Sequence, residues 1–60
     1  MQTLQPPDLE ILRQAMALET EGRKFYLKAA EAAEEESGRD AFQHLANDEK
    51  DHLALLRRQY

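Results

Sequence analysis

The sequence predicts an all-α fold, an antiparallel hairpin of two helices. The 60-residue chain has only two Gly and two Pro and is rich in Ala, Leu and Glu, a composition typical of helices. In two segments, apolar residues recur at spacings of three and four, the period of a helix. The acidic run Glu34-Glu35-Glu36 separates these segments. We therefore expect one domain over residues 1–60, with one helix at about 7–34 and a second at about 36–58.

Composition excludes several classes of protein. A net charge of −4 with interspersed signs argues against nucleic acid as a partner, because such proteins carry a basic patch. The absence of Cys excludes disulfides, zinc ribbons and Fe–S clusters. No apolar run approaches the ~20 residues of a membrane span, and no signal-peptide pattern is visible. We expect no membrane partner and a cytoplasmic location, with the inside of a protein compartment as the alternative.

The first helix carries one residue that does not suit an apolar face. Pro6 and Pro7 can begin the helix, since its first turn needs no N–H partner. Glu19 then interrupts the apolar positions. It lies on a line of residues seven apart: Leu12, Glu19, Tyr26 and Ala33. A flanking line widens the apolar face: Ile11, Leu18 and Phe25.

The sequence allows two positions for the turn. Ser37-Gly38 suits a turn by composition, because Gly commonly closes a helix. A turn at residues 33–36 instead places Glu35 and Glu36 at the positive end of the second helix dipole. Such a turn also brings Glu19 level with Glu49, whereas a turn at residue 38 would offset them by about 8 residues, or ~12 Å. We predict a turn at residues 33–36.

The second helix has a more regular apolar stripe, interrupted at its centre by Glu49 and His52. Its members are Phe42, Leu45, Ala46, Glu49, His52, Leu53, Leu56 and Tyr60. Residues three apart share a helix face, so the Glu-x-x-His pair would point the same way. Alone, such a pair is more often solvated than functional. Its position on an apolar stripe, matched by Glu19 on the other helix, favours a role in binding.

A single hairpin would leave an apolar face on each helix exposed. Two copies would complete a four-helix bundle, so we predict a homodimer or a higher homo-oligomer. The dimer would gather four carboxylates, from Glu19 and Glu49, and two imidazoles, from His52. Buried carboxylates need counter-charge, which two divalent cations would supply. We predict Glu19, Glu49 and His52 as metal ligands, with Fe²⁺ or Mn²⁺ as the metal and Zn²⁺ as an alternative.

Two segments of the chain, Glu19–Tyr26 and Phe42–His52, resemble the ferritin-like superfamily, in particular its rubrerythrin and encapsulated-ferritin branches. That superfamily takes a Glu from each of two helices and Glu-x-x-His from each of the other two. The resemblance implies a ferritin-like bundle with two iron ions per dimer, and ferroxidase- or peroxidase-type oxidation of Fe²⁺ by O₂ or peroxide. The Tyr26 hydroxyl would hydrogen-bond a site carboxylate.

The chain also departs from these relatives. Rubrerythrins carry two such helix pairs in one chain, whereas encapsulated ferritins have one pair and share the site between subunits, which is how we read this chain. Without a Cys-ligated iron domain, peroxide reduction would need an external electron donor. A protein shell is a second potential partner. The alternative function is a non-catalytic, dimerising helical module that binds Zn²⁺, Mn²⁺ or no metal.

Overall fold

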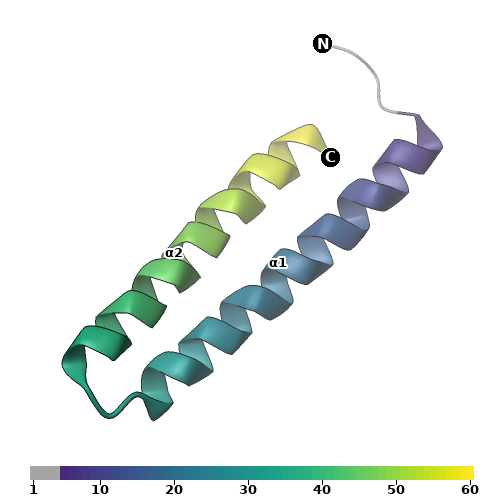
Figure 1. Cartoon of the computed structure of the whole chain (residues 1–60). Helices are drawn as coiled ribbons and strands as arrows, with labels where there is room; N and C mark the ends of the chain where they lie inside the picture. Colours follow the sequence, from purple (N-terminus) through teal and green to yellow (C-terminus); the bar gives the residue numbers. More distant parts are fainter. Residues whose placement is uncertain (1–4) are drawn as a thin grey trace.

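Residues 5–60 form two antiparallel α-helices that lie side by side and are joined by a short turn (Figure 1). This computed structural model places α1 at Pro6–Ala32 and α2 at Glu36–Gln59. The predicted all-helical hairpin is therefore confirmed for the part of the chain that the structure describes. Helix α1 ends earlier than the expected residue 34, because the backbone at Ala33 is extended (φ −66°, ψ 127°).

The helix ends follow the charge and proline signals in the sequence. Pro6 occupies the first position of α1, where its missing N–H leaves no hydrogen bond unmade. Asp8 lies in the first turn of α1 and Glu36 in the first turn of α2, near the positive ends of the helix dipoles. Arg57 and Arg58 lie in the last turn of α2, near its negative end. The end charges of α2 thus both have the stabilising sign.

The turn comprises residues 33–35. The guanidinium group of Arg39 donates a hydrogen bond to the carbonyl oxygen of Ala33 at 3.3 Å, which ties the start of α2 to the end of α1. Ser37 and Gly38 lie in the first turn of α2, so the competing turn at these residues does not form. This register brings the middle of α1 level with the middle of α2.

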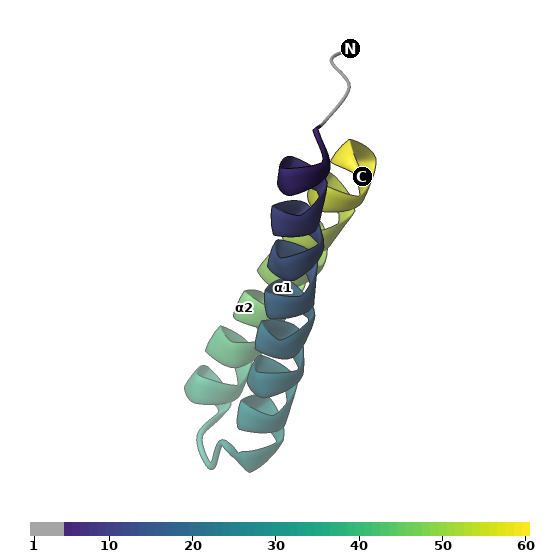
Figure 2. The same ribbon diagram turned by 90° about the vertical axis from the view of Figure 1, so that its right-hand side faces the viewer.

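The hairpin has a small core and much exposed apolar surface. Among the described residues only Ala30, Ala46 and Leu53 are buried hydrophobic residues. The Cα atoms extend only 8 Å along the thinnest axis, as expected for a single layer of two helices (Figure 2). Neither helix in residues 5–60 is long and apolar enough to cross a membrane. The helices therefore bury little of their apolar surface against each other.

One side of the hairpin carries most of this exposed apolar surface. Ile11 and Gln59 line the same shallow hollow at the open end, so they lie on one side of the hairpin. Residues seven apart stay nearly in line on a helix. Steps of seven from Ile11 along α1 lead to Leu18 and Phe25. Steps of seven back from Gln59 along α2 lead to His52 and Leu45. We define the apolar face as Ile11, Leu18, Phe25, Leu45 and His52.

The opposite side is distinguished by Leu27. It follows Phe25 by two residues and so points nearly the other way, since 3.6 residues make one turn. Leu27 lines a separate hollow with Arg39 and Gln43. The two sides of the hairpin thus differ, and the large, highly exposed apolar side chains of α1 lie on the apolar face.

Candidate metal centre

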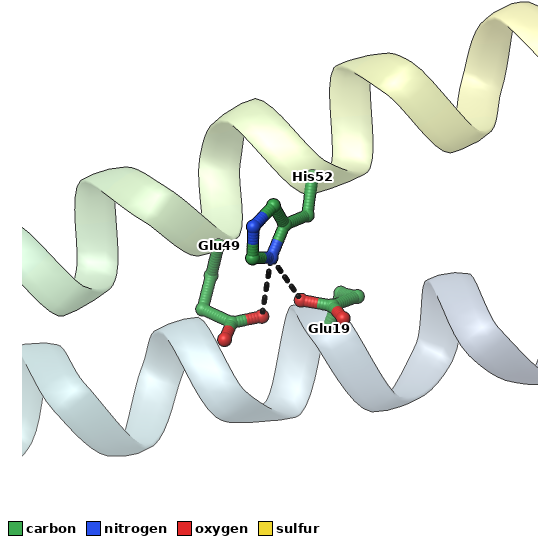
Figure 3. A group of neighbouring side chains, drawn as sticks. All are labelled: Glu19, Glu49 and His52. Carbon is green, nitrogen blue, oxygen red and sulfur yellow. Dashed lines mark hydrogen bonds and ion pairs between the residues drawn. The ribbon is translucent and has the colours of Figure 1, made fainter.

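Three side chains converge between the two helices at mid-length (Figure 3). Glu19 comes from α1, while Glu49 and His52 come from α2. Each offers one ligand atom, and these atoms all lie within 4.8 Å of one another. Among residues 5–60 this is the one group of three or more acidic or histidine side chains so arranged. The structure therefore brings together the three residues that the sequence analysis selected.

The imidazole of His52 lies between the two carboxylates. Its Nδ1 atom is 3.4 Å from Oε2 of Glu19 and 4.0 Å from Oε2 of Glu49. When Nδ1 carries a proton it can donate a hydrogen bond to Glu19. Glu49 and His52 meet because they are three residues apart on α2. Glu19 and His52 are 33 residues apart, so their contact depends on the position of the turn.

The carboxylates lack a permanent counter-charge. The side chains of Glu19 and Glu49 are only 28% and 19% exposed, whereas that of His52 is 57% exposed. Among residues 5–60, no Lys or Arg nitrogen comes within 4.0 Å of either carboxylate. Removing a carboxylate from water is costly unless an opposite charge is close. The site is therefore short of positive charge, which a divalent cation would provide.

The donor set fits a transition-metal ion. Two carboxylates and one neutral imidazole suit Fe²⁺, Mn²⁺ or Zn²⁺. Bonds of about 2.1 Å separate two ligands of one ion by at most ~4.2 Å. The ligand atoms lie within 4.8 Å of one another, which is only slightly wider than this limit. Three donors fill half of an octahedral shell. One chain would therefore leave room for further ligands.

Tyr26 is not hydrogen-bonded to a site carboxylate in this hairpin. No such bond occurs among the described residues, and the ring instead packs edge-on against Phe25, with centroids 5.6 Å apart. Tyr26 follows Glu19 by two turns of helix, or ~10.5 Å along the axis, which keeps the two apart. A contact from Tyr26 to a site carboxylate stays a prediction for the assembled bundle.

Arg23 is a partly buried residue of α1 that the sequence analysis did not single out. Its side-chain Nε atom is buried and has no hydrogen-bond partner among the described residues. Its spacing of four from Glu19 is the signal in the sequence, since such residues share a helix face. The pair forms no salt bridge within 4.0 Å. Arg23 therefore does not neutralise the site.

Comparison with known proteins places the chain in a family. A protein-family model described as Rubrerythrin matches residues 10–60. The chain belongs to the rubrerythrin family. The rubrerythrin match includes all three converging residues, Glu19, Glu49 and His52, and confirms the resemblance to the ferritin-like superfamily. Searches of curated proteins and of solved structures returned no match.

Proposed function

We propose that two copies of this chain form a four-helix bundle that binds two iron ions and oxidises Fe²⁺ with O₂ or peroxide. The observation that carries this proposal is the convergence of Glu19, Glu49 and His52 at a site without a Lys or Arg counter-charge. Membership of the rubrerythrin family, whose members typically bind iron, supports iron over the other metals that the donor set accepts.

The position of His52 supports a site shared between two chains. Its exposed imidazole is on the apolar face, beside the line of Ile11, Leu18 and Phe25, which are 63%, 73% and 65% exposed. An apolar strip of this kind typically marks an interaction surface. A second hairpin, related by a twofold axis and packed here, would cover the apolar face and add its own three ligands. Six side chains would then serve two ions, so each ion gains donors beyond three where a carboxylate binds both ions. The same contact would cover the exposed apolar face.

The charges then balance. Four carboxylates from two copies of Glu19 and Glu49 carry four negative charges, which two divalent cations neutralise. His52 would bind as neutral imidazole and leave that balance unchanged. The donor set alone also accepts Mn²⁺ or Zn²⁺.

The chain's residues would hold the metal and shield it. Iron bound here supplies one-electron redox chemistry, in which two Fe²⁺ ions and two protons reduce one H₂O₂ to two H₂O. Glu49 is the candidate bridging ligand, because it is the more buried of the two carboxylates. His52 would be a terminal ligand, and Glu19 would complete the set in either role. An external electron donor would be needed to restore Fe²⁺ for repeated turnover.

The test adds Fe²⁺ to metal-free protein, either in air or with peroxide. Near-UV absorbance then follows the oxidation of Fe²⁺. We expect oxidation faster than in buffer, and loss of this acceleration in Glu19→Ala and Glu49→Ala. Glu21→Ala is the matched control, because Glu21 is exposed on the same helix and pairs with Lys24. If the parent is no faster than buffer, or the site variants match the parent, the oxidase proposal is wrong. Metal binding without oxidation would indicate the non-catalytic module instead.

A further inference from the structure

Gly22 lies in the middle of α1 without a backbone reason to be glycine. No described residue, glycine or other, has a positive φ. The backbone at Gly22 is ordinary helix, which alanine adopts more readily than glycine does. A glycine at this position therefore weakens the helix and meets no conformational requirement.

The space beside Gly22 is taken up by one side chain. A Cβ atom built at this position would lie 3.6 Å from both Cδ and Oε2 of Glu49 and 3.9 Å from its Cγ. These are the three nearest heavy atoms, and the distances are those of ordinary van der Waals contact. The same Oε2 atom lies 4.0 Å from Nδ1 of His52. The missing methyl group would thus touch the carboxylate oxygen that points toward the other ligands.

We propose that Gly22 is a positioning residue for Glu49, and that its missing side chain gives the carboxyl group room to turn about the Cγ–Cδ bond. A carboxylate can bind a metal through one oxygen or through both, and can bridge two ions. Changing between these modes moves Oε2 sideways, into the space that a Cβ at residue 22 would fill. The inference rests on the proposed function, since it assumes that Glu49 is a metal ligand.

Gly38 provides a matched control. It also has a helical backbone, in the first turn of α2. A Cβ atom there would meet only Cβ of Ala33, at 3.8 Å, and no residue of the site. Gly22→Ala and Gly38→Ala are therefore the same chemical change in the same kind of backbone, one beside Glu49 and one remote from it.

The experiment titrates Co²⁺ into metal-free parent, Gly22→Ala and Gly38→Ala, with calorimetry for affinity and visible absorption for coordination. Both variants are expected to melt no lower than the parent, because alanine is the better helix former. We expect Gly38→Ala to bind like the parent. Gly22→Ala should bind the second Co²⁺ per dimer at least tenfold more weakly and with a changed spectrum, because Glu49 can no longer bridge freely.

Three results would overturn the inference, and they are distinguishable. If Gly22→Ala binds both Co²⁺ ions with the affinity and spectrum of the parent, Gly22 does not position Glu49, and the proposed metal site is unaffected. If the parent itself binds no Co²⁺, the metal site is wrong and the role of Gly22 falls with it. Equal weakening in Gly22→Ala and Gly38→Ala would also contradict the inference, since the effect would not depend on contact with Glu49.

Discussion

Leu18 offers a direct test of the proposed dimer, because at 73% it is the most exposed large apolar residue among residues 5–60. Leu18→Ala removes three carbons, worth ~2.4 kcal/mol if they are fully buried at ~0.8 kcal/mol per CH₂. Scaled by the exposed fraction of 73%, the loss is ~1.7 kcal/mol per chain. With two copies in a symmetric interface, the dimer would lose ~3.5 kcal/mol, or about 300-fold in its dissociation constant.

Sedimentation equilibrium over a range of protein concentrations, with Mn²⁺ in excess, measures this constant. Leu27→Ala is the control, because Leu27 is 41% exposed and lies on the opposite side of the hairpin, beside Arg39 and Gln43. We expect Leu27→Ala to leave the dissociation constant nearly unchanged. An unchanged constant in Leu18→Ala, or an equal effect of both variants, would refute the assignment of the apolar face as the interface.

Three further predictions concern the metal. Metal at 100 times its dissociation constant should raise the free energy of unfolding by ~2.7 kcal/mol, and EDTA should reverse the rise. A melting temperature that metal leaves unchanged would contradict binding to the folded state. Glu49→Gln should strengthen the metal-free dimer, because it removes repulsion between carboxylates, and sedimentation would show this. The same variant should weaken metal binding, as metal analysis would show. A weaker metal-free dimer would contradict the proposed repulsion between carboxylates. His52→Ala should lower Fe²⁺ affinity at least tenfold in chelator competition, and an unchanged affinity would show that His52 is not a ligand.

The hairpin was predictable because its signals are local. Helical periodicity needs only one segment at a time, and the charges of Glu35 and Glu36 favoured the earlier of two possible turns. Once the turn is near residue 34, Glu19 must lie level with Glu49 and His52. The end of α1 was less predictable, because Ala and Glu both favour helix and neither marks a stop. Ala33, the extended residue that follows the last residue of α1, carries no such signal.

Other features depend on rotamers and helix packing, which spacing does not specify. The contact of Gly22 with Glu49 follows from how closely α1 and α2 approach and from the direction of one side chain. The edge-on packing of Tyr26 against Phe25, and the buried Nε of Arg23, depend on side-chain torsions in the same way. Sequence periodicity could place these residues on a face but could not say what each of them touches.

One chain is proposed to supply half of a two-metal site. Native mass spectrometry of protein loaded with excess Fe²⁺ under anaerobic conditions measures chain number and metal number together. We predict a dimer that carries two iron ions, and monomer with little bound iron, because a single chain offers three ligand side chains and no carboxylate from a second chain. A monomer that carries iron as readily as the dimer does, or a dimer that carries none, would contradict the account.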